Sequence, residues 1–322
     1  MKPSLRTALC TLVMASLLPS AWSGPLIDAI KERREKRREA AEAAESKTST
    51  DELDSSDSET KSRLALPSGA RALMDQRYGP DGAHKLDVYI PNGAKGAPIL
   101  FMVHGGAWMV GDKAASKVVA NKVARWLPKG YIVASVNYRM SRQPKVMDQV
   151  DDVARALAFV QSHAADWGGD GARVLVLGHS SGAHLVSLLA SDSKLASQQG
   201  AKPWLGTVSL DSAAFNVVDI MSSKHYGFYD RVFGKEREFW EQASPYYRLT
   251  GALASPMLIV CSARRSDSCP QAQAYAGKAS GLGSRVTVLP VDLAHGDVNG
   301  QLGTAGDYTT RVETFMRGVG LP

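Results

Sequence analysis

The chain has 322 residues, of which 44% are hydrophobic and 22% charged, and 38 Lys and Arg residues against 32 Asp and Glu residues give a formal charge of +6. This composition is typical of a globular protein and excludes a collagen, a wholly disordered chain and a disulfide-rich miniprotein. The length allows one large or two medium domains. The positive charge is well below that of a nucleic-acid-binding protein, so no nucleic-acid partner is predicted.

The N-terminal segment has the pattern of a secretory signal peptide. Residues 1–23 combine a basic start, an apolar run and the small-x-small sequence Ala21-Trp22-Ser23, which is typical of a cleavage site. The apolar run is shorter than the roughly 18 residues that span a bilayer, so we expect cleavage rather than retention as an anchor. The sequence therefore predicts a secreted or periplasmic protein without stable membrane insertion.

A charged tail is predicted over residues 24–62. Its first part contains KERREKRRE and can form a solvated helix, whereas its second part lacks aromatic residues and any apolar period. We expect this tail to be largely disordered because it cannot build a core. The missing apolar face favours a spacer over the alternative, a helix that binds lipid headgroups or cell-wall polymer.

From residue 63 onward, segments typical of strands and helices alternate. The predicted strands are residues 86–90, 98–103, 131–138, 173–177, 206–210, 257–261 and 285–289. The predicted helices are residues 114–127, 147–167, 182–190, 271–279 and 308–319. The assignment rests on apolar periodicity and on β-branched and aromatic content. This alternation predicts one α/β domain over residues 63–322, with a mostly parallel sheet covered by helices on both faces.

The first chemical motif lies where the fourth predicted strand meets the helix after it. Gly178-His179-Ser180-Ser181-Gly182 matches G-x-S-x-G, in the strand-turn-helix context of a nucleophile elbow. Flanking glycines let strand and helix close around a serine with strained backbone angles, and the helix N-terminus favours developing negative charge. Ser180 is therefore the predicted nucleophile.

A glycine loop, HGGAW at residues 104–108, follows the second predicted strand. Acyl transfer builds an oxyanion, which backbone N–H groups stabilise where no side chain obstructs their approach. The loop offers such groups at Gly105 and Gly106, with Ala107 as an alternative donor. The N–H of Ser181 completes the predicted oxyanion hole.

These motifs resemble those of the α/β-hydrolases with an HGG-type oxyanion loop. That group includes hormone-sensitive-lipase-like esterases, feruloyl and acetyl-xylan esterases, and kynurenine formamidases. The resemblance runs from Leu86 to the C-terminus and is carried by LDVYIP, HGGAWMVGDK, GHSSGAHL and WEQASP. It is closer to the feruloyl-esterase and formamidase branch, since Ala-Trp replaces a third glycine. Ser181 departs from the alanine of many relatives, although only its backbone is required.

The resemblance implies the order nucleophile, acid, histidine. Of the seven histidines, only His225 and His295 follow the elbow helix, and His295 lies just after the last predicted strand, where the general base is expected. Asp267 follows the sixth predicted strand, where the family usually places the acid. Asp211 ends the fifth predicted strand and is the alternative that some relatives use. The predicted triad is Ser180, Asp267 and His295.

A disulfide is expected between Cys261 and Cys269. The third cysteine, Cys10, lies in the signal segment, and an exported chain meets an oxidising compartment. The alternative is a pair of buried thiols. If formed, the bridge closes the loop that carries Asp267.

The remaining patterns concern the ligand. An aromatic-rich insert at residues 215–247 is expected to place one or two side chains on the substrate and to pack the others. Trp108 is expected to pack, with a substrate contact as the alternative. Metal-ligand spacing and a dinucleotide or phosphate loop are missing from the sequence, so no metal or cofactor is predicted.

The sequence predicts a serine hydrolase that cleaves a small-molecule or polysaccharide-linked carboxylic ester through an acyl-enzyme on Ser180. An amidase resembling the formamidases is the second hypothesis, which the expected export disfavours. A non-catalytic binding domain on the same fold is the third.

Overall fold

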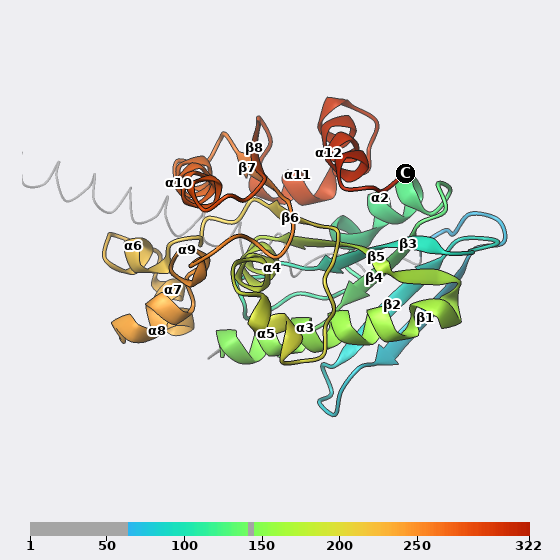
Figure 1. The fold of residues 1–322 in the computed structure, drawn as a ribbon, viewed down its shortest axis with the longest axis horizontal. Coiled ribbons are helices and arrows are strands. Elements are labelled where there is room, and N and C mark those ends of the chain that lie inside the picture. Colours follow the sequence, from blue (N-terminus) through green and yellow to red (C-terminus); the bar gives the residue numbers. More distant parts are fainter. Residues whose placement is uncertain (1–63, 141–144) are drawn as a thin grey trace, which may run out of the picture. The chain divides into compact units, whose positions relative to one another are not determined.

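The computed structural model describes residues 64–140 and 145–322. The predicted signal peptide and charged tail lie outside these residues. Eight strands form one sheet in the order β1-β2-β4-β3-β5-β6-β7-β8 (Figure 1). The strands are β1 (Arg71–Arg77), β2 (Lys85–Ile90), β3 (Ala97–Val103), β4 (Ile132–Val136), β5 (Gly169–His179), β6 (Gly206–Leu210), β7 (Met257–Ser262) and β8 (Val286–Val291).

The sheet is antiparallel at one edge and parallel elsewhere. β1 pairs with β2 and β2 pairs with β4 in antiparallel fashion, whereas β4, β3, β5, β6, β7 and β8 are all parallel to their neighbours. The carboxyl ends of these six strands therefore share one edge of the sheet, where ligand sites of open α/β folds form.

Helices connect most of the parallel strands. They are α2 (Ser116–Trp126), α3 (Val146–His163), the 3₁₀ helix η1 (Ala164–Trp167), α4 (Ser181–Ser191), α5 (Ser193–Ser197), α6 (Val217–Met221), α7 (Gly227–Phe233), α8 (Arg237–Gln242), α9 (Pro245–Arg248), α10 (Ser268–Gly281), α11 (His295–Gly300) and α12 (Asp307–Gly318). None of the helices in the described part of the chain has the length and hydropathy of a membrane span.

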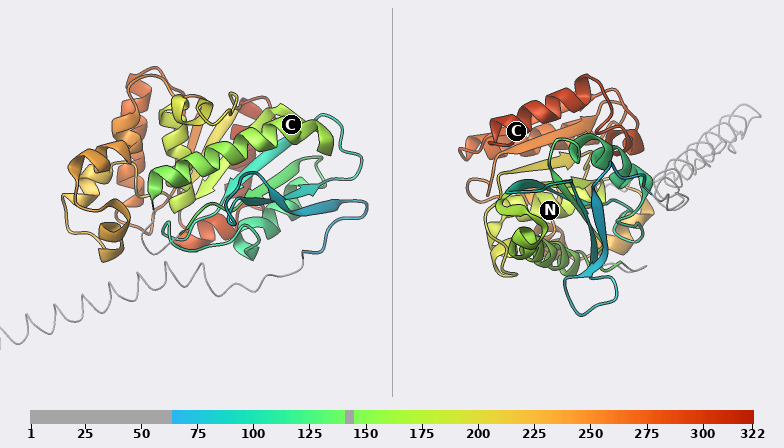
Figure 2. Two further views of the ribbon diagram at one scale, coloured as in Figure 1. Left: turned by 90° about the horizontal axis from the view of Figure 1, so that it is seen from below. Right: turned by 90° about the vertical axis from the view of Figure 1, so that its right-hand side faces the viewer.

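Two apolar cores lie on opposite faces of the sheet, and Figure 2 shows helices covering both faces. β3 is buried along its whole length, with Phe101 in one core and its neighbours Leu100 and Met102 in the other. Helices α3, α4, α5, α7 and α10 contribute to the first core, and α2, α11 and α12 to the second. Strands of a parallel sheet that is covered on both faces have continuous apolar sequences, and for this reason these strands could be predicted.

The structure confirms the predicted α/β fold and differs from the prediction in its less regular parts. β1 was not predicted, because RALMDQR is an edge strand with a register shift between Leu73 and Gln76 and no fully buried residue. The aromatic insert at residues 215–247 contains the short helices α6, α7 and α8 and the start of α9. The short helix α11, which begins at His295, was also not predicted.

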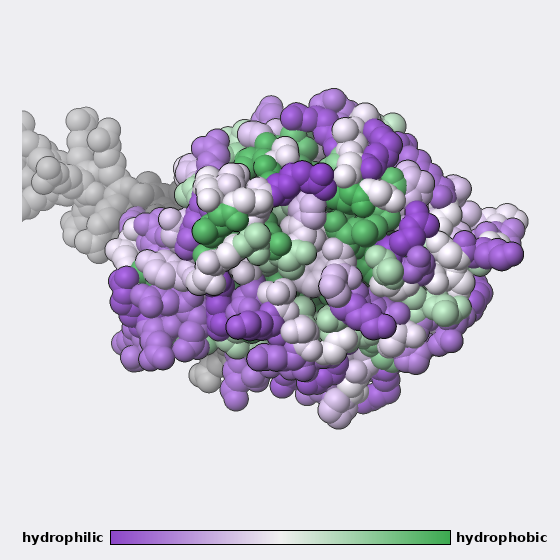
Figure 3. All heavy atoms as spheres, viewed as in Figure 1, coloured by the Kyte–Doolittle hydropathy of each residue, from purple (hydrophilic) through white to green (hydrophobic). Residues whose placement is uncertain are grey.

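The face of the molecule drawn in Figure 3 is mostly hydrophilic, with hydrophobic residues in separate patches. Among the large apolar side chains of the described residues, those that are exposed are Met74, Tyr247 and Leu282. Most large apolar side chains of the described residues are thus buried in the two cores.

Candidate active site

Ser180 lies on a sharp turn between β5 and α4. Its backbone has φ 52° and ψ −119°, a strained combination for a non-glycine residue, and its N–H donates to the Leu210 carbonyl at 2.9 Å. The turn closes tightly, because a Cβ at Gly182 would lie 2.3 Å from the His104 carbonyl oxygen. The predicted nucleophile elbow is therefore present, with Ser180 at its apex.

The glycine loop after β3 lies directly against Ser180. A Cβ at Gly105 would lie 2.9 Å from Ser180 Cβ, and Gly106 has φ +126° with a hypothetical Cβ 1.9 Å from the Val110 carbonyl oxygen. Ala107 and Trp108, next in the loop, have φ values of 49° and 62°. Only glycine fits at positions 105 and 106, so the loop backbone can approach Ser180 closely.

His295, at the start of α11, is paired with Asp211. His295 Nδ1 lies 2.6 Å from Asp211 Oδ2, and the Asp211 side chain has no exposed surface. Asp211 Oδ1 accepts hydrogen bonds from the Ser262 N–H at 2.7 Å and the Ser268 hydroxyl at 2.5 Å. Burial alone would raise the pKa of Asp211, but the hydrogen bond from His295 and the charges of His295 and Arg265 hold it well below its usual range. Asp211 is therefore an ionised partner for the imidazole.

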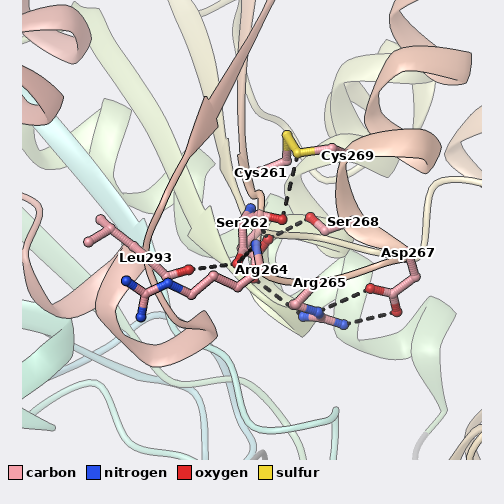
Figure 4. Close-up of a disulfide and its surroundings, with 9 residues drawn as sticks. Cys261, Ser262, Arg264, Arg265, Asp267, Ser268, Cys269 and Leu293 are labelled. Atoms are coloured by element: carbon pink, nitrogen blue, oxygen red, sulfur yellow. Dashed lines mark hydrogen bonds and ion pairs between the residues drawn. A yellow bond between two sulfur atoms is a disulfide. The ribbon is translucent and has the colours of Figure 1, made fainter.

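Asp267 does not contact His295 in this way, which corrects the predicted choice of acid. Its side chain is 43% exposed, and its two oxygens accept hydrogen bonds from Nε and Nη2 of Arg265 at 3.1 and 3.2 Å (Figure 4). The reason is local. Asp267 directly precedes α10, and its side chain is partly exposed. Asp211 directly follows β6, the neighbour of β5, which leads to Ser180. Asp211 also has a positive φ of 53°.

Arg265 is a site residue that the sequence analysis missed. Its Nη1 lies 2.7 Å from His295 Nδ1 and 3.4 Å from Asp211 Oδ2, and its side chain is 17% exposed. The preceding Arg264 is 54% exposed and pairs with Asp292. No signal in the sequence distinguishes these adjacent arginines.

A disulfide joins Cys261 and Cys269, as expected, with an S–S distance of 2.03 Å. Figure 4 shows that it closes the loop that carries Arg265 and Ser268. This loop supplies Asp211 with the Ser268 hydroxyl and the Arg265 guanidinium. The bridge therefore restrains Ser268 and Arg265, which contact Asp211. It also restrains the partly exposed Asp267.

Two cavities flank Ser180. The first, with a volume of about 40 Å³, is lined by the glycine loop, Lys117 and His295. The second, of about 20 Å³, is lined by Trp108, Phe228, Tyr229 and Arg265. Both volumes are far below the roughly 300–1,000 Å³ of typical ligand pockets.

Trp108 both packs and lines the second cavity. It is 4% exposed, and its indole N–H donates to His184 Nδ1 at 3.1 Å. The His184 Nε2–H in turn donates to the Ala243 carbonyl at 2.7 Å. Burial lowers the pKa of His184 to about 4, so this histidine stays neutral and keeps both hydrogen bonds. The wall of the cavity is therefore fixed to α4 and to the insert.

The other histidine considered for the general base lies elsewhere. His225 pairs with Asp230 at 3.2 Å, and it lines neither of the two cavities beside Ser180. Within residues 64–140 and 145–322, no cluster of three or more His, Cys, Asp or Glu side chains has the arrangement of a metal site.

Part of the chain is similar in sequence to a known family and to known esterases. Residues 86–222 match the BD-FAE family model. A probable isoprenylcysteine alpha-carbonyl methylesterase of Oryza sativa subsp. japonica is 31% identical over 164 residues, 48% of this chain and 38% of that protein. Esterase LipQ of Mycobacterium tuberculosis is 34% identical over 165 residues, 50% of this chain and 36% of that protein. The chain spans less than half the length of either relative.

Solved structures share the fold. A carbohydrate esterase from gut microbiota superimposes with a TM-score of 0.65 at 20% identity, covering 80% of this chain and 98% of that chain. Esterase B from Lactobacillus rhamnosis superimposes with a TM-score of 0.64 at 16% identity, covering 89% and 95%. The described fold therefore extends over almost the whole of these structures.

Proposed function

We propose that the chain is an α/β-hydrolase of the group with an HGG-type oxyanion loop, and that it is a serine hydrolase that cleaves carboxylic esters. The observation that carries the proposal is the pairing of His295 with the buried, ionised Asp211 beside a serine on a nucleophile elbow. Ser180 and His295 line the same cavity. The esterase relatives support an ester over an amide as substrate.

In the proposed mechanism, Ser180 Oγ attacks the ester carbonyl while His295 accepts the hydroxyl proton at Nε2. Asp211, at Nδ1, orients the imidazole and stabilises the imidazolium. The oxyanion is bound by the N–H groups of Gly105, Gly106 and Ser181. The C–O bond then breaks, and His295 returns the proton to the departing alcohol. Water, activated by His295, hydrolyses the acyl-enzyme and releases the acid and free Ser180.

The test is covalent labelling of the wild-type protein with a fluorophosphonate, followed by peptide mapping. We expect one label, on Ser180, together with hydrolysis of p-nitrophenyl acetate and butyrate. A protein that takes no label and hydrolyses no ester would overturn the proposal in favour of a binding domain. Faster turnover of N-formyl amides than of any ester would assign it to the amidases instead.

The two small cavities predict a preference for short acyl groups. Their volumes of about 40 and 20 Å³ leave little room for a long acyl chain beside Ser180. We expect kcat/KM for p-nitrophenyl acetate or butyrate to exceed that for the dodecanoate by about tenfold or more, since one methylene group too many in a pocket costs about 1–3 kcal/mol. Equal values across the chain-length series would contradict this prediction.

We propose that the protein is exported, to the periplasm or to the medium. The pattern of residues 1–23 and the disulfide between Cys261 and Cys269 support this location, because disulfides persist in oxidising compartments. Fractionation of the producing cell and N-terminal sequencing test it. A cytoplasmic protein that retains Met1 would overturn it.

A Gly105→Ala variant is expected to lose about 100-fold or more in kcat. The added Cβ would lie 2.9 Å from Ser180 Cβ and 3.0 Å from His179 Nδ1, so the loop must shift, and loss of one oxyanion donor costs on the order of 100- to 1000-fold. Steady-state hydrolysis of p-nitrophenyl acetate measures the effect. Gly277→Ala is the control, because its Cβ enters open space on α10; an equal loss in both variants would contradict the prediction.

Replacing Cys261 and Cys269 by serine is expected to lower turnover even under conditions in which the variant stays folded. The loop between them holds Asp211 through Ser268 and Arg265, and removing a disulfide typically costs about 2–4 kcal/mol of unfolding free energy. At a temperature where the variant is still folded, kcat should fall about tenfold, as expected for a partly misplaced catalytic group. Unchanged turnover of the folded double variant would show that the bridge has no part in positioning Asp211.

A further inference from the structure

His179 fills the first variable position of G-x-S-x-G and has no part in the mechanism above. It is the last residue of β5, directly before Ser180, and its side chain is 7% exposed. It lines the larger cavity together with Ser180 and His295. At this position the buried imidazole lies between His295 and the glycine loop.

The first contact fixes the tautomer of His179. Its Nε2 lies 3.0 Å from the backbone carbonyl oxygen of His295. A carbonyl oxygen can only accept, so Nε2 carries the hydrogen and Nδ1 carries the lone pair. Burial and then the charge of His295 lower the pKa of His179 well below its usual value, so the ring stays neutral. The hydrogen bond therefore anchors the first residue of α11 to the end of β5.

The second contact is between rings, and the third is with the glycine loop. The His179 and His295 rings lie 4.6 Å apart between centroids, at an angle of 37°. Gly105 is also in close contact, since a Cβ there would lie 3.0 Å from His179 Nδ1. One side chain thus contacts the backbone and ring of His295 and lies close to Gly105 of the oxyanion loop.

We propose that His179 is a positioning residue, which holds His295 and the Gly105 backbone in register with Ser180. This inference rests on the proposed ester hydrolysis and adds to it a residue outside the triad and the oxyanion hole. Asp211 orients His295 through Nδ1, and His179 fixes the same residue through its carbonyl and ring face. A displacement of about 1 Å of a catalytic group can cost about 100-fold in rate, so the second restraint is expected to matter for turnover.

The test compares three variants at position 179 by kcat and KM for p-nitrophenyl acetate and by the rate of fluorophosphonate labelling. His179→Leu and His179→Asn should lower kcat and the labelling rate about 100-fold with KM nearly unchanged. Leucine has no donor, and the amide of asparagine is too short to take the place of Nε2. His179→Gln places its amide N–H where Nε2 lies and should keep kcat within about fivefold of wild type.

His84→Leu is the matched control. His84 is equally buried, at 2% exposure, and its Nε2 pairs with Asp152 at 2.8 Å, away from the residues that line either cavity. It should lose stability in thermal unfolding yet keep kcat per folded molecule. Wild-type kcat in His179→Leu, or an equal loss in the Gln and Asn variants, would overturn the positioning role while leaving the proposed function intact. A wild-type protein without hydrolysis or labelling would instead overturn the proposed function.

Discussion

An Asp211→Asn variant is expected to lose about 10,000-fold in kcat, the effect known for the equivalent change in a serine-protease triad. The structure gives a specific reason. Asp211 Oδ1 accepts from the Ser262 N–H and the Ser268 hydroxyl, so an asparagine must keep its carbonyl oxygen on that side. Its NH₂ then donates to His295 Nδ1. This places the imidazole hydrogen on Nε2, and His295 cannot accept the Ser180 proton.

Asp267→Asn is the matched control for this prediction. The Asp267 side chain is 43% exposed and pairs with the Arg265 guanidinium, which Asp211 and His295 also contact. We expect kcat to fall by no more than about tenfold, because surface ion pairs are worth about 1 kcal/mol or less. Steady-state kinetics and thermal unfolding of both variants make the comparison. A larger loss in Asp267→Asn than in Asp211→Asn would return the role of the acid to Asp267.

Replacing Ser180 by alanine is expected to lower kcat by about a million-fold, as loss of the nucleophile does in subtilisin. A residual rate above that of water should remain, since the oxyanion hole still binds the developing charge. Fold stability should change little, because the strained backbone of the elbow has the same φ requirement for alanine as for serine. Kinetics, fluorophosphonate labelling and thermal unfolding check the three statements.

Ser187→Ala provides the control for Ser180→Ala. Ser187 is fully buried on α4, the same helix that follows the nucleophile, and its hydroxyl donates to the Ala183 carbonyl. This variant should lose some stability and keep its turnover. Hydrolysis or labelling that persists in Ser180→Ala at the wild-type level would show that another group is the nucleophile.

The parts of the site that the sequence predicts are those in which a short segment determines its own geometry. G-x-S-x-G requires close packing at Gly182, and the HGG loop requires a positive φ at Gly106, so each motif constrains a turn within five residues. The parallel strands were predictable for a similar reason, since burial on both faces leaves uninterrupted apolar runs such as that of β3.

The acid could not be chosen in this way. Asp211 and Asp267 both follow strands, and β6 and β7 are neighbours in the sheet, so both backbones reach the same edge near His295. What separates them is the direction of each side chain. The donors Ser262 and Ser268 hold Asp211 inward, while Arg265 pairs with Asp267 on the solvent side. These contacts depend on the conformation of one loop, for which local sequence gives no period or motif.

Four residues of the site, Ala107, Trp108, Ser180 and Asp211, have positive φ values although none is a glycine. A sparsely populated backbone conformation of this kind costs a non-glycine residue on the order of 1–3 kcal/mol, and the rest of the fold must supply that stability. Selection for heat resistance and selection for turnover therefore act in opposite directions at these positions. A library screened only for thermal survival should accumulate relaxing substitutions such as Ala107→Gly around the nucleophile, whereas stabilising changes that preserve function are to be sought in the distant cores.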